Sequence, residues 1–530
     1  MRTAVHCNAH RPGRRLRLAS IGLAMLMPGG AFAGGPGSAP VAAAAADAPA
    51  TRAAAPTPAT ANDSAPHFQT CRLELANRLA AYPAECTTLR VPEDPAHPDG
   101  RSIELSIARV AAISRRKAAD PLFLIAGGPG GGTQAMYPMV AGAFARIGRD
   151  RDLVLVDQRG TGRSAPLDCE LDEEDLTSGD PTLVPALARR CLESLQGAGR
   201  DVRPYTTSVA VQDLERVRAA LGYERINLYG VSYGTRVAQH YLRRFPQRTR
   251  SVILDGVVPP GLALGPAMAL DAEAALARIL ARCAADAACH AAYGDPVALY
   301  RSLRARLATA PVELRVADPA TGTPRELRFG AQHLGAVLRL ASYADAQASL
   351  LPMALHEAQV NANFTPLAGL FLMSSAGLEG QVAFGMHNTV ICSEDIPFID
   401  ARDVDRARLA STYLGTEMLD GLRAICGVWP RGPMDADFRQ PLASDVPVLL
   451  LSGADDPVTP PAGAETAMRG LTRSRHLVVP GEGHSQLGVT CMDRVMADFV
   501  RDADPKALDT SCLARSKPAP FFTSPAGPPP

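Results

Sequence analysis

A serine with a glycine two residues to either side is the first feature of this sequence that could do chemistry. Ser232 lies in the stretch Gly230-Val231-Ser232-Tyr233-Gly234, between a short apolar run and an amphipathic segment. A strand, a sharp turn and a helix in this order would expose the serine hydroxyl as a nucleophile. The same short pattern also occurs by chance in glycine-rich connections, so the role of Ser232 depends on finding its partners elsewhere in the chain.

The base and the carboxylate that a serine nucleophile needs have candidates near the end of the chain. His484 follows an apolar run in "VVPGEGHSQ", and Asp456 ends another apolar run in "VLLLSGADD". His476 begins its apolar run and is the poorer candidate for the base, while Asp455 remains a rival for the carboxylate. The order Ser, Asp, His along the chain is the one expected for a triad on an α/β-hydrolase fold.

A glycine-rich loop could supply backbone N–H groups that stabilise an oxyanion during acyl transfer. The segment from Ala126 to Gly132 follows a buried apolar run and contains the sequence "GGPGGG". We expect one N–H donor from this loop and the other from Tyr233, the residue after the serine. A phosphate-binding loop is the alternative, but the segment lacks the Gly-Lys-Ser/Thr and Gly-x-Gly-x-x-Gly patterns that would open a helix. The sequence therefore predicts no nucleotide or other organic cofactor.

Short apolar runs alternate with helical patterns around these candidate residues. One helix is predicted over 209–221, where Val211, Leu214 and Val217 share a face. The strand patterns lie in "SIELSIARVAA", "PLFLIAGG", "RDLVLVDQ", "INLYG" and "SVILDG", and they resume after residue 445 in "VPVLLLSGADD" and "RHLVVPGEGH". This alternation predicts an α/β fold with a mostly parallel sheet and helices on both of its faces.

The alternating pattern breaks between residues 263 and 437. Ala- and Leu-rich helical segments fill this stretch, and "VELRVADPATGTPRELRF" within it predicts a β-hairpin. We interpret the stretch as a mainly helical cap inserted between two strands of one sheet. The expected domains are a first core part over 66–262, the cap over 263–437 and a second core part over 438–516.

Residues 1–33 have the pattern of a secretory signal peptide. A basic start precedes an apolar run from Leu18 to Met27, and Ala31-Phe32-Ala33 offers a small-residue cleavage site. A membrane anchor is the alternative, but this run falls well short of the ~20 apolar residues that span a bilayer. We expect a secreted or periplasmic protein after cleavage near Ala33.

Two other segments are too poor in large apolar residues to form a core. Residues 34–65 consist almost entirely of Ala, Pro, Gly, Ser and Thr, and they predict a disordered linker. Residues 517–530 are Pro-rich, and they predict a disordered tail.

The charges of the chain are balanced. Lys and Arg together number 54, as do Asp and Glu, within a total of 530 residues. No charge-driven affinity for nucleic acid or for an anionic membrane is therefore expected. The hydrophobic share of 47% is typical of a globular protein, and the length favours more than one domain.

Cysteine usage agrees with export. Of the 11 cysteines, Cys7 lies in the predicted signal peptide, and the remaining even number suggests disulfides. A metal site has little support, because no Cys-x-x-Cys pair and no Cys/His cluster at zinc spacing occurs. Sequence does not fix the connectivity; the simplest hypothesis pairs neighbours, namely Cys71–Cys86, Cys169–Cys191, Cys283–Cys289, Cys392–Cys426 and Cys491–Cys512.

Taken together, the motifs resemble those of the secreted tripeptidyl aminopeptidases and the related proline iminopeptidases, which are serine exopeptidases of the α/β-hydrolase fold. The matching stretches are "GGPGGG", "DQRGTGRS", "GVSYGT", "CGVWP", "GADDPVTPP" and "GEGH", and the resemblance spans about residues 70 to 512. It implies a triad of Ser232, Asp456 and His484, and oxyanion donors at Gly128 and Tyr233. Iminopeptidases often carry His where this chain has Ala126, which favours the tripeptidyl branch.

An aminopeptidase must recognise the protonated α-amine of its substrate, so a carboxylate should face the mouth of the cleft. The stretch "VICSEDIP" offers Glu394 and Asp395 where the cap returns to the sheet. We expect Glu394 to anchor the amine, with Asp395 beside it as a second substrate-binding candidate. A solvated acidic loop is the alternative interpretation of this stretch.

Three functions remain open from the sequence. The leading hypothesis is a secreted serine exopeptidase that acts on peptides with a free N-terminus and releases tripeptides or N-terminal residues. An esterase or lipase on the same fold would use the same triad, because a fold does not determine its substrate. A non-catalytic secreted module that binds peptides or partners is the third. Epoxide hydrolases and dehalogenases of this fold are disfavoured, since they place Asp where this chain has Ser232.

Overall fold

The computed structural model describes residues 66–75, 79–169, 181–319, 321–378 and 382–528. The predicted signal peptide and linker, residues 1–65, lie outside the described residues. Within the described ranges, no helix combines the length and the apolar composition needed to cross a lipid bilayer.

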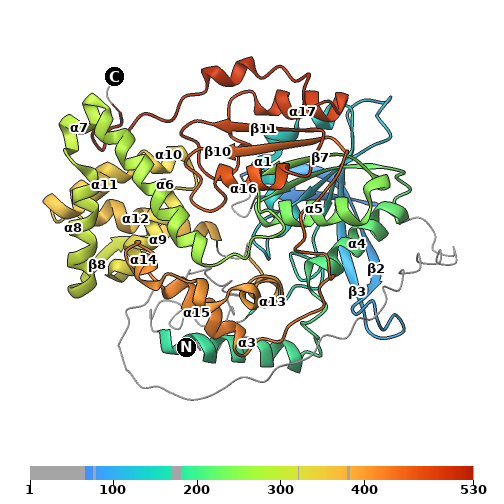
Figure 1. The fold of residues 1–530 in the computed structure, drawn as a ribbon, viewed down its shortest axis with the longest axis horizontal. Helices are drawn as coiled ribbons and strands as arrows, with labels where there is room; N and C mark the ends of the chain where they lie inside the picture. The colour runs from blue at the N-terminus through green and yellow to red at the C-terminus, as the bar shows by residue number, and fades with distance from the viewer. Residues whose placement is uncertain (1–65, 76–78, 170–180, 320, 379–381, 529–530) are drawn as a thin grey trace, which may run out of the picture.

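One large sheet in the described part of the chain has the strand order β1-β2-β3-β5-β4-β6-β7-β10-β11 (Figure 1). The first three neighbouring pairs are antiparallel, and every pair from β5 to β11 is parallel. The strands are β1 (Gln69–Glu74), β2 (Ala81–Pro92), β3 (Ser102–Val110), β4 (Leu122–Ile125), β5 (Leu153–Val156), β6 (Ile226–Val231), β7 (Thr249–Asp255), β10 (Val448–Gly453) and β11 (Ser474–Val479). Every residue of β4, β5, β6 and β10 is buried, which is typical of parallel strands covered on both faces.

Helices cover the two faces of this sheet. Apolar residues of α1 (Thr133–Phe144) and α17 (Met492–Asp502) pack with strand side chains on one face. The opposite face is covered by α3 (Val184–Gly197), α4 (Thr207–Ala220), α5 (Tyr233–Arg244) and α16 (Pro461–Met468). The mostly parallel sheet with helices on both faces, predicted from the alternating pattern, is confirmed.

Between β7 and β10 the chain is mainly helical (Figure 1). It contains α6 (Pro266–Ala285), α7 (Ala287–Tyr293), α8 (Pro296–Thr309), α9 (Ala331–Ala341), α10 (Asp345–Ala348), α11 (Leu351–Val360), α12 (Thr365–Leu378), α13 (Phe384–Glu394), α14 (Arg406–Ala410) and α15 (Glu417–Cys426), with the hairpin β8 (Val312–Ala317) and β9 (Pro324–Phe329). Helices α6, α8, α9, α11 and α12 share a hydrophobic core of their own. Helix α13 instead packs into the core beneath the sheet, through Met386, Val390 and Cys392. Helix α13, near the end of the insertion, therefore packs into the hydrophobic core of the domain that carries the sheet.

The C-terminal segment packs against the helical insertion, and the prediction of a disordered tail is wrong for residues 517–528. Phe521 is buried in a cluster with Ile279, Cys283 and Tyr293 of the insertion. The N–H of Phe522 also donates to the carbonyl of Ser349 at 3.2 Å. A Pro-rich composition suggested disorder, but one buried aromatic ring and backbone hydrogen bonds fix the segment. Figure 1 shows the chain end beside α7, on the other side of the molecule from α17.

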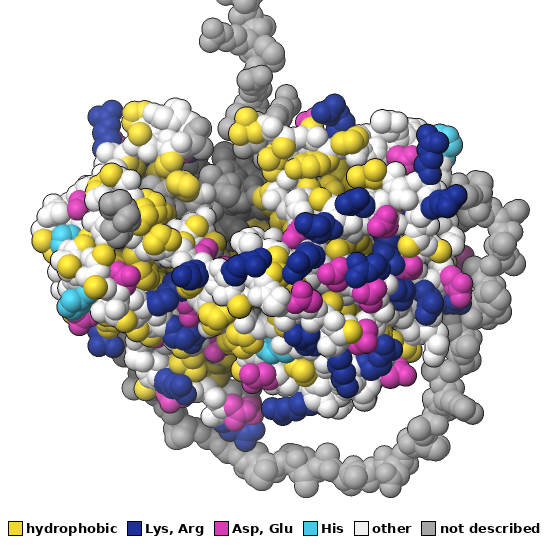
Figure 2. Space-filling model, turned by 90° about the horizontal axis from the view of Figure 1, so that it is seen from above, with side chains coloured by type: hydrophobic (Ala, Val, Ile, Leu, Met, Phe, Trp, Pro, Cys, Tyr) yellow, Lys and Arg dark blue, Asp and Glu magenta, His cyan; other side chains and the backbone are white. Residues whose placement is uncertain are grey.

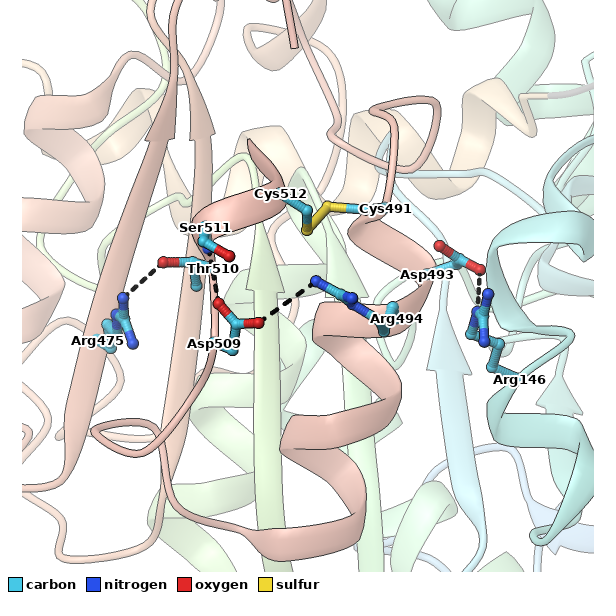
Figure 3. The surroundings of a disulfide bond; sticks show 9 residues. All are labelled: Arg146, Arg475, Cys491, Asp493, Arg494, Asp509, Thr510, Ser511 and Cys512. Carbon is cyan, nitrogen blue, oxygen red and sulfur yellow. Dashed lines mark hydrogen bonds and ion pairs between the residues drawn. A yellow bond between two sulfur atoms is a disulfide. The ribbon is translucent and has the colours of Figure 1, made fainter. Parts of the chain in front are cut away.

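Disulfides join the same neighbour pairs that the sequence predicts: Cys71–Cys86, Cys169–Cys191, Cys283–Cys289, Cys392–Cys426 and Cys491–Cys512. The last of them ties the residue before α17 to the short helical turn at Ser511–Arg515 (Figure 3). An ion pair between Arg494 and Asp509 spans the same two segments at 3.7 Å. Several disulfides are typical of proteins that fold in an oxidising, extracytoplasmic compartment.

The molecular surface carries no strong charge bias on the face shown in Figure 2. Basic and acidic side chains are intermixed there, in agreement with the formal net charge of +0.

Candidate active site

Ser232 lies at the junction of β6 and α5. Its backbone has φ 56° and ψ −125°, a region that L-residues rarely adopt. The chain crosses itself closely here: a Cβ at Gly230 would collide with the carbonyl of Gly234, and a Cβ at Gly234 would collide with that of Ile125. Both positions therefore require glycine. A strained serine on a strand–turn–helix junction has the geometry of a nucleophile elbow.

His484 and Asp456 form a buried hydrogen-bonded pair. Nδ1 of the imidazole lies 2.9 Å from Oδ2 of Asp456, which is 0% exposed. The other carboxylate oxygen accepts hydrogen bonds from the N–H groups of Val458 at 2.8 Å and Thr459 at 2.9 Å. Since an ionised carboxylate can only accept, Nδ1 carries the proton and Nε2 is left to act as a base.

Asp455 and His476, the alternative candidates for the carboxylate and the base, form contacts with other residues. Oδ1 of Asp455 accepts a hydrogen bond from Arg278 at 3.0 Å, and its Oδ2 lies 3.3 Å from a guanidinium nitrogen of Arg282. His476 on β11 has its Nε2 2.9 Å from the hydroxyl of Ser452. Neither residue takes part in the hydrogen-bonded pair described above.

The electrostatics of the pair favour a charged histidine. Burial disfavours the imidazolium, but the charge of Asp456 and the hydrogen bond to it outweigh burial and raise the pKa of His484 above its ordinary 6.5. Burial also acts to raise the pKa of Asp456, yet His484 and the surrounding N–H groups lower it below its ordinary 3.8. The pair therefore stabilises the imidazolium that a general base forms when it takes a proton.

The end of β7 connects the serine to this pair. The N–H of Ser232 donates to the carbonyl of Asp255 at 2.8 Å. A Cβ on the next residue, Gly256, would lie 3.0 Å from Cε1 of His484. Strands β6, β7, β10 and β11 are parallel neighbours, so their carboxyl ends meet at one edge of the sheet. The structure thus brings Ser232, Asp456 and His484 to the same edge, where ligands of such sheets bind.

The glycine-rich loop passes directly beside the serine. A Cβ placed on Gly127 would lie 2.9 Å from Cβ and 3.6 Å from Oγ of Ser232. Gly128, the next residue, has φ 120°, a conformation that favours glycine. Its proposed role as an oxyanion donor, together with the N–H of Tyr233, stays a prediction.

The "DQRGTGRS" segment holds these loops in place. Asp157 accepts hydrogen bonds from the N–H groups of Gln134, in the first turn of α1, at 2.9 Å and of Arg163 at 3.0 Å. Arg159 is 0% exposed and donates two hydrogen bonds to Asp213 of α4, at 2.6 and 2.9 Å. The segment therefore ties β5 to the start of α1, next to the glycine loop, and to α4.

The two carboxylates predicted to face the mouth of the cleft are buried instead. Glu394 and Asp395 are both 0% exposed. Asp395 accepts hydrogen bonds from two nitrogens of Arg236 at 3.0 and 2.9 Å and from the N–H of Leu264 at 2.8 Å. Glu394 accepts from the N–H and the hydroxyl of Thr207 at 2.7 and 2.9 Å. The expected exposure is wrong, because Arg236 and the start of α4 supply partners in the interior. A role of Glu394 or Asp395 in binding substrate stays a prediction.

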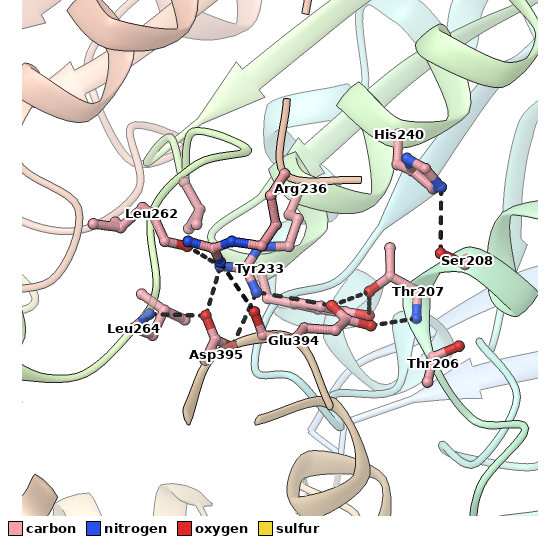
Figure 4. A network of polar contacts seen from close by, with 12 residues as sticks. Thr206, Thr207, Ser208, Tyr233, Arg236, His240, Leu262, Leu264, Glu394 and Asp395 are labelled. Atoms are coloured by element: carbon pink, nitrogen blue, oxygen red, sulfur yellow. Dashed lines mark hydrogen bonds and ion pairs between the residues drawn. The ribbon is translucent and has the colours of Figure 1, made fainter. Parts of the chain in front are cut away.

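Glu394 is connected to the nucleophile elbow by side-chain hydrogen bonds (Figure 4). The hydroxyl groups of Thr207 and Tyr233 are 2.6 Å apart, and the Gln158 amide donates to Tyr233 at 3.1 Å. Burial raises the pKa of Glu394 to about 7, against the opposing charge of Arg236. The chain of contacts fixes the side chain of Tyr233, whose N–H is a candidate oxyanion donor.

Two residues close to His484 were not singled out from the sequence. The hydroxyl of Thr459 donates to Oδ2 of Asp456 at 2.8 Å and lies 3.1 Å from Nδ1 of His484. Its position three residues after the aspartate in "DDPVT" could have indicated this contact. Tyr343 of the insertion accepts a hydrogen bond from the N–H of His484 at 2.7 Å, with the two rings 5.1 Å apart. No local pattern marks Tyr343, because this contact joins distant parts of the chain.

Comparison with known proteins gives relatives across most of the chain. Residues 120–282 match the family described as alpha/beta hydrolase fold, and residues 411–512 match that described as TAP-like protein. The serine protease Hip1 of Mycobacterium tuberculosis is 28% identical over 79% of this chain and 85% of the relative. The tripeptidyl aminopeptidase of Streptomyces coelicolor is 32% identical over 34% of this chain and 36% of the relative. A carboxylesterase B of M. tuberculosis is 28% identical over 82% of this chain and 87% of the relative.

The fold, the elbow serine and these matches identify a serine hydrolase with the α/β-hydrolase fold. Parts of the chain are similar to a tripeptidyl aminopeptidase and to the family described as TAP-like protein, in line with the motifs that the sequence carries. The relatives support a serine peptidase, and one of them is an esterase by name.

Proposed function

We propose that this protein is a secreted serine exopeptidase that hydrolyses peptide bonds near the free N-terminus of peptides and releases tripeptides or N-terminal residues. The observation that carries the proposal is the buried pair of His484 and Asp456 at the sheet edge that also carries the strained Ser232. Relatives named as a serine protease and a tripeptidyl aminopeptidase support the choice of peptide substrates.

The proposed reaction proceeds in two halves through an acyl-enzyme. Nε2 of His484 removes the proton of the Ser232 hydroxyl as its oxygen attacks the scissile carbonyl. The imidazolium then returns this proton to the leaving amine, which departs as the carbon–nitrogen bond breaks. In the second half, His484 activates a water molecule that releases the N-terminal fragment from the serine. Asp456 keeps the imidazole oriented and stabilises its charged form throughout.

Backbone N–H groups would stabilise the negative oxygen formed in each half of this reaction. Tyr233 follows the serine at the start of α5, where the helix dipole also favours negative charge. Gly128 is the proposed second donor, in the loop that passes beside Ser232. Such preorganised donors typically contribute about 2.7–4 kcal/mol each to transition-state stabilisation.

The helical insertion is suited to restricting which substrates enter. Tyr343 from this insertion contacts the ring and the N–H of His484, and α6 contacts Asp455 beside the triad aspartate. A site covered in this way would accept short or unfolded N-terminal segments more readily than folded proteins.

Export is part of the proposal. The disulfides indicate folding outside the cytoplasm, and residues 1–33 carry the predicted signal peptide. Sequencing the N-terminus of the protein recovered from the periplasm or medium should give a start close to Gly34. A mature protein that retains residues 1–33 would contradict this.

An esterase is the second candidate, favoured by the relative named carboxylesterase B. Turnover of a peptide p-nitroanilide with a free amine, compared with a p-nitrophenyl ester of a short fatty acid, separates the two functions. The peptidase proposal expects the anilide to be cleaved with a kcat/KM that the Ser232→Ala variant abolishes. Hydrolysis of the ester alone would identify an esterase.

Labelling with a serine-directed fluorophosphonate tests the nucleophile itself. The expected site of modification is Ser232, located by mass spectrometry of the digested protein. The same instrument then identifies the fragments released from a defined peptide mixture, which gives the number of residues removed per cut. Labelling at another serine would overturn the proposed mechanism.

A further inference from the structure

Hydrogen bonds near both ends of helix α6 hold this part of the insertion beside the active site. Just before it begins, the N–H of Leu264 donates to Asp395 at 2.8 Å, in the cluster next to the elbow helix. Towards its end, Arg278 donates to Asp455 at 3.0 Å, and Arg282 donates to the carbonyl of Gly481 at 3.1 Å. Asp455 and Gly481 belong to the loops that carry Asp456 and His484. The helix therefore extends from the elbow side of the site to the histidine side.

Asp271 lies on the face of α6 that is turned towards these loops. Residues 271, 275, 278 and 282 are separated by four, three and four positions, which places them in one row along a helix. Arg278 and Arg282 in this row contact the triad loops directly. Asp271 is two turns nearer to the elbow, between the anchored ends. Burial and the negative charge of Asp456 raise its pKa to about 6, against the opposing charge of Arg278.

The carboxylate of Asp271 is half-buried without a protein partner. None of the hydrogen bonds and ion pairs among the described residues involves its side chain. By contrast, Glu273 on the same helix accepts hydrogen bonds from the hydroxyl of Tyr300 and the N–H of Tyr413. Removing a carboxylate from water without a partner costs free energy, and a second carboxylate nearby adds to the cost. A positively charged group supplied by the substrate would offset both.

We infer that Asp271 is a specificity-determining residue that binds the protonated α-amine of the peptide substrate. The inference rests on the proposed aminopeptidase function and names the group that recognises the free N-terminus. An ammonium group offers several N–H donors, and its hydrogen bonds to a carboxylate are charge-assisted. Glu394 and Asp395, the carboxylates expected to do this from the sequence, have their oxygens occupied by Thr207, Arg236 and Leu264.

The test compares two substrates that differ only at the amine: an alanine tripeptide p-nitroanilide and its N-acetylated form. The measured quantity is the ratio of kcat/KM for the free over the acetylated substrate. The Asp271→Asn variant, which keeps the shape of the side chain and removes its charge, should lower this ratio about 10–100-fold, as expected for the loss of a charged hydrogen bond. Asp271→Glu, which restores the charge, should recover part of the ratio.

Glu313→Gln is the matched control. It also removes one negative charge from the insertion, at a position on β8 where the side chain is 78% exposed and pairs with Arg328. This variant should keep the wild-type ratio.

An Asp271→Asn variant with an unchanged ratio would overturn the inference. This includes the case in which both substrates are cleaved more slowly by the same factor, because such a result indicates an effect on folding or on the triad. A wild-type protein without any preference for the free amine would instead refute the aminopeptidase function itself.

Discussion

The imidazole of His484 is bonded through Nδ1 to Oδ2 of Asp456 at a distance of 2.9 Å, and the carboxylate is completely buried. An ion pair in this environment is poorly screened by solvent, so the two groups influence each other's protonation strongly. The pH dependence of activity and the effects of nearby substitutions follow from this relationship.

Activity should rise with pH through a midpoint above the ordinary histidine value. His484 must be neutral to take the proton of Ser232, and its pKa is raised above 6.5 by Asp456. Protonation at low pH therefore removes the base, and half of the maximal kcat/KM is expected above pH 6.5. A pH profile of kcat/KM on a peptide anilide measures this midpoint. An acidic limb centred below that value would contradict the assignment.

The Asp456→Asn variant should be slower by about 10⁴-fold and should have its acidic limb at lower pH. The substitution removes the charge that raises the pKa of His484, and the amide can hold the wrong tautomer of the ring. His476→Gln provides the control, since His476 contacts Ser452 and lies outside the pair. It should leave the position of the acidic limb unchanged. If Asp456→Asn lowered the rate without moving the limb, the proposed coupling would be wrong.

The hydroxyl of Thr459, which is buried beside the pair of His484 and Asp456, should contribute to the rate. It donates to the same oxygen of Asp456 that accepts from His484. Thr459→Val removes this donor at nearly constant shape, and loss of a hydrogen bond to a charged group predicts a fall of about 10–100-fold in kcat/KM. Thr466→Val is the matched control, because the exposed hydroxyl of Thr466 donates to the carbonyl of Ala462 within α16, away from the pair. Equal rates for the two variants would rule out a role for Thr459.

Local sequence patterns correctly predicted those parts of the structure whose conformation depends on residues close together in the chain. The apolar runs ending before Ser232, Asp456 and His484 are β6, β10 and β11, and parallel strands bring residues after their carboxyl ends together. The hairpin of β8 and β9 and the neighbour pairing of cysteines depend on short separations in the same way.

Local patterns could not predict the burial of residues whose contacts come from distant segments of the chain. "VICSEDIP" looks like an exposed acidic loop, but Arg236 of α5, far away in the sequence, draws Asp395 into the interior. The prediction of a disordered C-terminal tail was wrong for a related reason, because Phe521 packs into a cluster of residues from α6 and α7. Burial of a single charge or ring depends on what faces it across the fold, and composition does not carry that information.

Arg236 should be important for stability. It is 2% exposed and bonds Asp395 through two nitrogens, with Glu394 at 3.8 Å. Arg236→Met leaves both carboxylates buried without their cation, which typically costs about 3–5 kcal/mol. Arg402→Met breaks an exposed pair with Asp400 and serves as the control. Thermal unfolding should show a clear loss only for the first variant, and the double variant Arg236→Met/Asp395→Leu should regain much of it. An unchanged midpoint for Arg236→Met would contradict the structural role of the cluster.

The anchoring of the C-terminal segment by Phe521 can be tested by limited proteolysis. The ring is 7% exposed, lies in a cluster with Cys283 and Cys289 of α6 and α7, and is faced by Arg282 at 5.4 Å from its centroid. Truncating a buried phenylalanine typically costs about 3–5 kcal/mol, which corresponds to an increase of at least about 100-fold in the population of the detached segment. Trypsin should therefore cut Phe521→Ala after Arg515 much faster than wild type, as followed by mass spectrometry.

Val360→Ala, at a side chain that is 58% exposed, is the control and should leave the rate of cleavage after Arg515 unchanged. Equal cleavage of wild type and Phe521→Ala would mean that the segment is held by other contacts, such as the hydrogen bond from the N–H of Ala519 to Asp345.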